Sequence, residues 1–335
     1  MGGCNLNMTN IKIKDIAIYH PSNAVDNDYF FEHFKSRGDD SKHFIENILG
    51  RKSRYMIDND DENSLTMAYK ASKLVLEKSH LSGEDLDMII FSSQTPEYLA
   101  TSNAIQLHHK LQGKHSTLTM DTNANCAGML VAIDQASRYM QANPFVQKAL
   151  VVGSDYNTLM ANPDEEISFA NFGDSACAVI LEKTEEDTGF IDSIYFTDSV
   201  TYSNTNFPRS GLSNAIKKNE EQSMVWIPFD GSIAMPPTYQ MFETMLSRNN
   251  LTITDLDAYC FSQFSISNIK TIQEYYQLDE DKLMYVGDRF GYTGTTSPLL
   301  ALYDGIENGR IKRGDKILFW TIGGGYQLVA LLMKY

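Results

Sequence analysis

The chain has 335 residues, 42% of them hydrophobic, so it is long enough to bury a large core and to form two domain-sized units. Its formal net charge of −15 excludes nucleic acid and anionic membrane surfaces as expected partners, because both would repel it. We expect no secretory signal and no membrane-spanning helix, and the four cysteines (Cys4, Cys126, Cys177, Cys260) lack metal-ligand spacing, which favours reduced thiols in a cytoplasm and no bound metal or other cofactor.

The first clear element along the chain is a turn followed by a buried strand, in residues 81–92. This segment reads LSGEDLDMIIFS, with polar turn residues before a continuous apolar run. A similar segment, LTITDLDAYCFS, occupies residues 251–262. The shared Asp-Leu-Asp signature indicates an internal repeat, although two amphipathic segments can also resemble each other by chance.

An apolar helix is predicted to begin close to Cys126, after the segment MDTN at residues 120–123. The residues that follow, including Met129, Leu130 and Ile133, recur at helical spacing. Unpaired backbone N–H groups and the positive end of the helix dipole favour a thiolate at such a position. Cys126 is therefore a candidate nucleophile. The alternative is an inert core cysteine, which is the commoner state of a lone cysteine in an apolar stretch.

Later segments continue the repeat and predict the architecture. A helix at 130–134 has a counterpart at 300–304, and strands at 149–153 and 317–322 follow in the same order. We predict an α/β protein of two pseudo-repeated halves, residues 1–183 and 184–335. The alternation favours mostly parallel sheets covered by helices, with ligands at the C-terminal ends of the strands near the junction of the halves. Cys126 should then face the loops that carry Ser262 and Tyr292.

The order of several short motifs resembles that of the thiolase-fold condensing enzymes, and within them the β-ketoacyl-ACP synthase III group. The motifs are NCAG at 125–128, VGSD at 152–155, FGD at 172–174, DRFGYT at 288–293 and GGG at 323–325. The resemblance spans nearly the whole chain. It implies a layered α-β-α-β-α architecture, a homodimer, and an acyl-S-Cys126 intermediate formed from a CoA or carrier-protein thioester. It also implies an oxyanion hole from the backbone N–H groups of Cys126 and Gly324, where a tight glycine turn is equally compatible.

The chain departs from this family at the His and Asn that polarise a thioester carbonyl there. Ungapped matching from the DRFGYT motif puts Ser262 at the His position and Tyr292 at the Asn position, and no histidine follows His115. Serine does not titrate near neutrality, and the reference pKa of tyrosine is near 10. Losing one such donor costs roughly 2–4 kcal/mol of transition-state stabilisation, so decarboxylative condensation is not expected. Tyr292 could equally fill the pocket without a catalytic role.

Positions that bind the CoA donor in this family are changed as well. The family's Trp and Arg at the adenine become Phe44 and Ile48, a second Arg becomes Glu166, and a third becomes Ser267. Three cations that would hold phosphates are thus lost. We retain these four residues and Gln263 as candidate substrate contacts.

The acyl tunnel also has a candidate gate. Ala100 stands at the dimer contact that closes the tunnel in the family, where a small residue would admit a longer or bulkier acyl chain. The alternative is that neighbouring residues repack this loop.

Three functions from different classes follow. We favour an acyltransferase of specialised or lipid metabolism that passes the acyl group from Cys126 to a nucleophilic acceptor, such as an alcohol, an amine or an activated ring carbon. The second is an ordinary decarboxylative β-ketoacyl-ACP synthase III of fatty-acid or polyketide initiation. The third is a non-catalytic subunit in a heteromeric complex with another thiolase-fold chain. Acylation of Cys126 would distinguish the two enzymes from the subunit.

Overall fold

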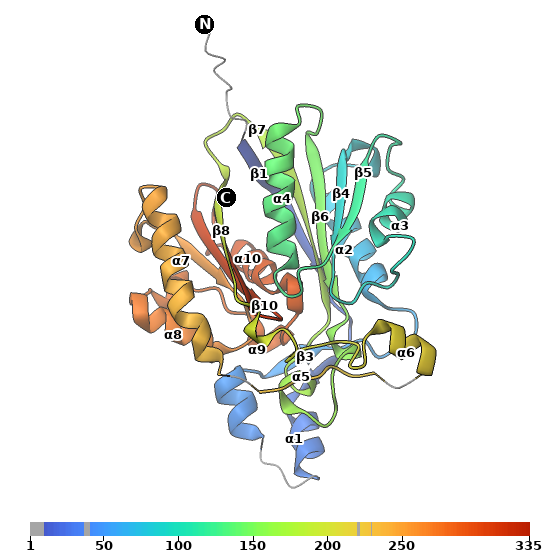
Figure 1. Ribbon diagram of the computed structural model, residues 1–335. Coiled ribbons are helices and arrows are strands. Elements are labelled where there is room, and N and C mark those ends of the chain that lie inside the picture. The colour runs from blue at the N-terminus through green and yellow to red at the C-terminus, as the bar shows by residue number, and fades with distance from the viewer. Residues whose placement is uncertain (1–9, 37–40, 220–221, 229) are drawn as a thin grey trace, which may run out of the picture.

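The computed structural model describes residues 10–36, 41–219, 222–228 and 230–335, which form two β-sheets with helices between and outside them (Figure 1). Cys4 lies outside the described residues, and the other three cysteines are free thiols. Within the described ranges, no helix is both long and apolar enough to cross a membrane.

The first sheet has five strands in the order β1-β7-β6-β4-β5. β4 is parallel to β5 and β6, whereas β7 is antiparallel to β6 and β1. Its central strands are buried along most of their length, as continuous apolar runs covered on both faces should be. The bounds are β1 Asn10–Tyr19, β4 Met88–Ser92, β5 Leu118–Thr122, β6 Lys148–Asp155 and β7 Ser175–Thr184.

The second sheet has four strands in the order β8-β11-β10-β9. β9 is parallel to β10, and the other two pairs are antiparallel. Because β7 ends at Thr184 and β8 begins at Gly189, the change of sheet falls beside residue 183. The bounds are β8 Gly189–Thr197, β9 Ala258–Phe261, β10 Lys316–Gly323 and β11 Gln327–Lys334, and a separate small sheet pairs β2 (Ala24–Asp26) with β3 (Ser53–Tyr55).

The expectation of mostly parallel sheets is wrong, because both sheets are mixed. Only the repeated units β4-β5, β4-β6 and β9-β10 are parallel. The last two strands are joined by only residues 324–326, and so short a connection can form only an antiparallel pair. The sequence repeat that predicted parallel strands does not include β1, β7, β8 and β11, and these strands pair antiparallel.

The helices complete five layers. Helices α4 and α10 lie between the two sheets and share one core with both of them, which explains why α4 is buried on nearly every side. Helices α2 and α3 cover the outer face of the first sheet, and α7 and α8 cover that of the second (Figure 1). The bounds are α1 Asn27–Lys35, α2 Ser64–Lys78, α3 Asn103–Lys110, α4 Gly128–Ala142, α5 Glu166–Phe169, α6 Leu212–Lys218, α7 Met235–Arg248, α8 Ile266–Tyr276, α9 Gly287–Phe290 and α10 Ser297–Glu307.

The two copies of the sequence repeat fold alike. In each copy a three-residue 3₁₀ turn precedes a buried strand, β4 in the first and β9 in the second. Asp85 accepts a hydrogen bond from the backbone N–H of Ser82 (2.8 Å), and Asp255 does the same with Thr252 (2.7 Å). The predicted layered fold of two repeated halves is confirmed, with α4 and α10 as the equivalent central helices.

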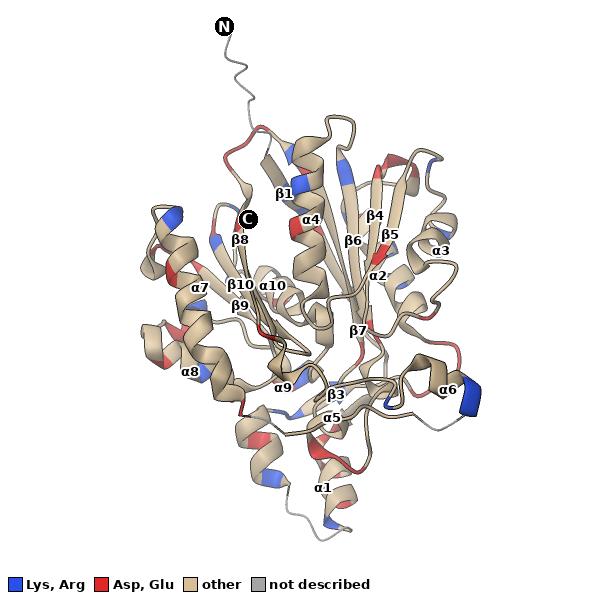
Figure 2. Cartoon of the chain, viewed as in Figure 1, with Lys and Arg blue, Asp and Glu red and all other residues tan. Residues whose placement is uncertain are grey.

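Charged side chains lie mainly on the helices and loops, and the strands of both sheets are largely uncharged (Figure 2). The interior between the sheets is packed with apolar side chains, which come from β1, β4, β6, β7, β9, β10 and β11. The negative net charge is therefore carried by the outer surface.

Candidate active site

A cavity of about 160 Å³ opens where the two halves meet, at the C-terminal ends of β4, β5 and β10. No Lys, Arg, Asp or Glu of the described chain lines it. Its walls are aromatic rings, thioethers, amides, a hydroxyl and the glycine turn after β10. The lining residues are Gln94, Asn123, Asn125, Cys126, Met160, Phe172, Thr205, Phe207, Met224, Trp226, Gly231, Phe264, Asn268, Tyr292, Ile322, Gly323, Gly324, Gly325 and Tyr326.

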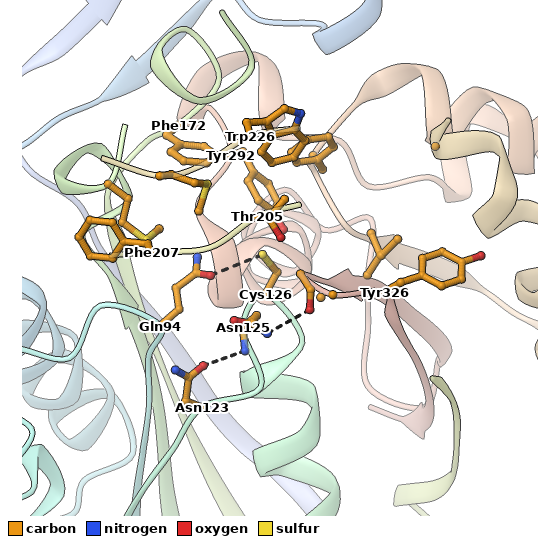
Figure 3. A pocket seen from close by; sticks show the side chains of 18 of the residues that line it. Gln94, Asn123, Asn125, Cys126, Phe172, Thr205, Phe207, Trp226, Tyr292 and Tyr326 are labelled. Carbon is orange, nitrogen blue, oxygen red and sulfur yellow. Dashed lines mark hydrogen bonds between the residues drawn. The ribbon is translucent and has the colours of Figure 1, made fainter. Parts of the chain in front are cut away.

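Cys126 lies at the floor of this cavity, in a tight turn between β5 and α4 (Figure 3). The turn depends on Asn125, whose φ of 51° is in the left-handed region that asparagine tolerates better than most residues. The Asn125 N–H donates to Asn123 Oδ1 (2.9 Å), and its side-chain amide donates to Gly324 O (3.2 Å). These bonds join the cysteine turn of the first half to the glycine turn of the second.

The environment of Cys126 does not favour the thiolate, contrary to the sequence prediction. Burial raises the pKa of the thiol to about 11, and the negative charge of Asp155 adds to the effect, although the Tyr292 hydroxyl opposes it. The first free N–H groups of α4 are also occupied, since Met129 N–H donates to Thr295 Oγ1 (2.6 Å). The Thr295 hydroxyl of the second half therefore accepts a helix N–H that was expected to stabilise a Cys126 thiolate.

Alkylation of Cys126 by iodoacetamide should be slow at pH 7 and should rise about tenfold per pH unit between pH 8 and 10. With a pKa of about 11, the thiolate is only about 0.1% of the thiol at pH 8, and each pH unit multiplies it about tenfold. Cys177 and Cys260 should react more slowly at every pH, because both are fully buried and burial raises their pKa further. Peptide mass spectrometry of the labelled protein measures all three rates. A pH-independent rate at Cys126 would contradict this assignment.

The glycine turn of residues 323–325 comes close to Cys126. A Cβ on Gly323 would lie 3.1 Å from Ala124 O, and Gly325 has a φ of 80°, so both positions require glycine. In the described chain, neither the Cys126 nor the Gly324 backbone N–H donates to another residue. Two unused donors beside a cysteine are the arrangement that an oxyanion hole needs.

Tyr292 of the second half lines the cavity beside Cys126, whereas Ser262 lies next to Tyr292 and does not line the cavity. Tyr292 is 3% exposed, and its backbone is fixed by hydrogen bonds with Asn171 O (2.7 Å) and Gly173 N (3.0 Å). Burial and the nearby Cys126 raise the pKa of its phenol well above 10. Tyr292 therefore holds its proton at neutral pH and acts as a donor, not a base. Ser262 Oγ is buried and has no hydrogen-bond partner.

The roof of the cavity was missed by the sequence analysis. It is a strap made of two extended arms, residues 204–207 and 224–227, held together by hydrogen bonds between backbones, Val225 N to Asn206 O and Ile227 N to Asn204 O (both 2.9 Å). Trp226 of the strap stacks on Phe264 (ring centroids 5.6 Å, 12°), which meets Tyr292 edge to face (5.0 Å, 90°). No periodicity marks these arms, since their partners lie elsewhere in the sequence.

The predicted substrate-binding residues do not border the cavity. Phe44 packs in a small cluster beside α1, Ile48 is 38% exposed, and Ala100 lies on the surface. Glu166 accepts a hydrogen bond from the Ser41 hydroxyl. These positions are outside the cavity of a single chain.

Gln263 and Ser267 have structural contacts instead. The Gln263 amide donates to Phe261 O (2.8 Å) and accepts from Val286 N (2.8 Å), so its hydrogen-bonding groups are occupied. The Ser267 backbone N–H donates to Ser265 Oγ (3.1 Å) in the first turn of α8. The next residue, Asn268, lines the cavity.

A buried arginine supports the site from behind. Arg51 is 1% exposed and donates from Nε to Asn171 Oδ1 (2.7 Å) and from Nη2 to the carbonyls of Gln263 and Phe264 (2.8 Å to the latter). Asn171 in turn accepts the N–H of Tyr292. One guanidinium therefore positions both segments that carry Ser262 and Tyr292.

The sequence and the structure both match one family. Residues 120–199 match the profile of 3-oxoacyl-(acyl-carrier-protein) synthase III, and residues 246–335 match that of its C-terminal region. β-Ketoacyl-(acyl-carrier-protein) synthase III of Koribacter versatilis is 27% identical over 97% of each chain, and that of Clostridium perfringens is 28% identical over 98% of this chain and all of its own. The crystal structure of 3-oxoacyl-(acyl-carrier-protein) synthase III from Aquifex aeolicus superposes with a TM-score of 0.84 at 23% identity, over 98% of this chain and all of that one. The chain belongs to the β-ketoacyl-(acyl-carrier-protein) synthase III family and has the thiolase fold.

Proposed function

We propose that this protein is an acyltransferase that forms an acyl-S-Cys126 intermediate from an acyl thioester and transfers the acyl group to a nucleophilic acceptor. The observation that carries the proposal is the cavity, where the backbone N–H groups of Cys126 and Gly324 donate to no other described residue and the described lining includes no histidine and no charged side chain. Acylation needs a nucleophilic sulfur and donors for the carbonyl oxygen. Cys126 would supply the sulfur through its small thiolate fraction, and the backbone N–H groups of Cys126 and Gly324 would supply the donors.

Decarboxylative condensation has less support from the same cavity. An enolate formed by loss of carbon dioxide needs donors at its oxygen throughout the step. Here the polarising His is replaced by Ser262, and the Asn by the phenol of Tyr292, whose ring is tilted against Phe172 and edge to face with Phe264. The acceptor in our proposal is nucleophilic already, so it needs no such enolate.

The acyl group is small and uncharged in this proposal. A cavity of about 150 Å³ with apolar walls holds a molecule the size of benzene, and the cavity here is about 160 Å³. Rings of Phe172, Phe207, Trp226 and Phe264 face it, so a benzoyl or a short branched acyl group fits its chemistry. The protein would then act in specialised or lipid metabolism.

Intact-protein mass spectrometry after incubation with acyl thioesters tests this function. We expect a mass gain of one acyl group on Cys126 with butyryl and benzoyl thioesters of N-acetylcysteamine and of CoA, and a weaker gain with dodecanoyl. Malonyl-CoA and malonyl-carrier protein should release little or no carbon dioxide, because Ser262 and Tyr292 stand in place of the His and Asn that hold the enolate oxygen in the family. The double variant Ser262→His with Tyr292→Asn should raise this release.

Two outcomes would reject the proposal. Rapid carbon dioxide release with formation of a β-ketoacyl product by the wild-type protein would identify a decarboxylative synthase. Absence of acylation by every thioester would leave the non-catalytic subunit as the function, and a stable complex with a second thiolase-fold chain would then be expected. A failed rescue by the double variant is less decisive, since the new side chains alter the packing around Phe264.

We also propose a second copy of the chain as a partner, a class of acyl donor and a cellular location. The exposed edge strand β5, with Leu118 38% exposed, and the neighbouring surface residue Leu99, 68% exposed, offer backbone and apolar groups to a second copy. We propose a homodimer through this edge, which would bring the Ala100 loop of one copy toward the other. The donor is an acyl-CoA or acyl carrier protein, and the location is the cytoplasm.

A further inference from the structure

We infer that Thr205 supplies a third donor to the oxyanion hole, from the strap that roofs the cavity. The inference rests on the proposed acyl-Cys126 intermediate and adds a catalytic residue to it. Its basis is one residue: Thr205 lines the cavity, and its Oγ1 is buried with no hydrogen-bond partner among the described residues. Buried hydroxyls in folded proteins nearly always have one, so each exception requires an explanation.

The Thr205 hydroxyl lies beside the proposed site of the thioester carbonyl oxygen. A Cβ built on Gly324 would lie 3.0 Å from Thr205 Oγ1, so the hydroxyl lies against the same residue whose N–H is free. Figure 3 shows Thr205 and Tyr292 side by side above Cys126, with Asn125 below it. A carbonyl oxygen held by the Gly324 N–H is therefore next to Thr205.

The strap keeps Thr205 in this place. Its two neighbours in the sequence, Asn204 and Asn206, accept the backbone N–H groups of Ile227 and Val225 (2.9 Å each). The second arm is tied to the first half of the chain by the bond from Met224 N to Met160 O (2.8 Å). Thr205 thus lies between two residues whose carbonyls are both hydrogen-bonded to the second arm. A donor that is fixed before the reaction needs no reorganisation during it.

The role in the reaction follows from the electron flow. When Cys126 Sγ attacks the thioester, a carbon–sulfur bond forms and the carbonyl π electrons move to the oxygen. When this oxyanion collapses back to a carbonyl, the bond from the carbonyl carbon to the donor's sulfur breaks, and the leaving sulfur takes the electron pair and the proton that Cys126 gave up. Thr205 donates a hydrogen bond to the oxyanion and keeps its proton throughout. The same contact acts again when the acceptor attacks acyl-Cys126, so both half-reactions depend on it.

Acylation of three variants by butyryl-N-acetylcysteamine tests the inference. Thr205→Val keeps the shape of the side chain and removes the hydroxyl, and it should lower the maximal rate of acyl-Cys126 formation about 10- to 100-fold, with little change in the half-saturating thioester concentration. Thr205→Ser should remain within about threefold of the wild type, because it retains the donor. Ser72→Ala is the matched control, since Ser72 Oγ is also buried without a partner but lies in α2, away from the cavity. It should acylate like the wild type.

Iodoacetamide distinguishes catalysis from packing. Its displacement reaction forms no oxyanion, so alkylation of Cys126 at pH 9 should be equal in Thr205→Val and the wild type. If the Val variant is slowed equally in alkylation and acylation, Thr205 only shapes the cavity and the inference is wrong. Equal acylation of the Val variant and the wild type also rejects it, while the proposed function stands. Absence of acylation in the wild type rejects both.

Discussion

Replacing Cys126 with alanine is expected to abolish acyl transfer, lowering acyl-enzyme formation by at least about 10³-fold, because the variant has no nucleophile for the thioester. Cys126→Ser should be nearly as inactive. A serine hydroxyl needs a base to become nucleophilic, the cavity contains no histidine, and the raised pKa of Tyr292 keeps that phenol protonated. Intact-protein mass spectrometry with benzoyl and butyryl thioesters measures the loss.

A matched cysteine variant controls for general effects of thiol loss. Cys177 is fully buried in β7, away from the cavity, so Cys177→Ala should still acylate at the wild-type rate. It should lower the free energy of unfolding by about 1 kcal/mol, through the small void left in the core. Acylation of the Cys126→Ala protein at the wild-type rate would show that another residue is the nucleophile and would remove the basis of the proposed function.

Replacing Arg51 with methionine is expected to lower the free energy of unfolding by about 3–5 kcal/mol. Among the described residues the guanidinium forms no salt bridge with a carboxylate, and burial lowers its pKa, although the more distant Asp288 opposes this. Its charge in the core is thus held mainly by hydrogen bonds to neutral oxygens. Methionine fills similar space but leaves Asn171 Oδ1 and the Gln263 carbonyl without a donor, and the Phe264 carbonyl with only that from Asn171 Nδ2 (3.2 Å). Orphaned acceptors of this kind each cost about 1–3 kcal/mol.

Urea unfolding monitored by circular dichroism measures this change. Arg138→Met is the control, because the Arg138 side chain is 54% exposed and pairs with Asp134 on the same helix (2.8 Å), so its loss should cost less than about 1 kcal/mol. Below the unfolding transition, Arg51→Met should also slow acylation, since the segments of Ser262 and Tyr292 lose their shared support. A stability equal to that of the control would show that water or a backbone shift satisfies the three oxygens.

Local features were predictable because short stretches of chain encode them. The turns at residues 82–85 and 252–255 each close through an aspartate three residues after a hydroxyl residue, so the repeat could be recognised before the strands were known to pair. The turn before α4 is also local, since Asn125 tolerates the left-handed backbone that presents Cys126. Motif order was enough to identify the family.

The mixed sheets, the strap and the protonation of the site could not be predicted in the same way. β7 and β11 reverse direction for reasons of connection length and pairing, which hydrophobic periodicity does not report. Thr205 and Trp226 carry no motif, and their positions over Cys126 depend on hydrogen bonds between arms that are distant in sequence. No local pattern in the sequence marks Arg51 as buried.

The sequence by itself determined the repeated α/β fold, the family, and the nucleophile candidate at the start of α4. The tertiary structure decided the chemistry around that nucleophile. It buried the thiol, placed the hydroxyl of Thr295 on the helix N-terminus, and raised the pKa of Cys126 to about 11. The physical reason is that turns and helix starts depend on neighbours a few residues away, whereas desolvation and unpaired donors depend on which distant segments meet in the fold.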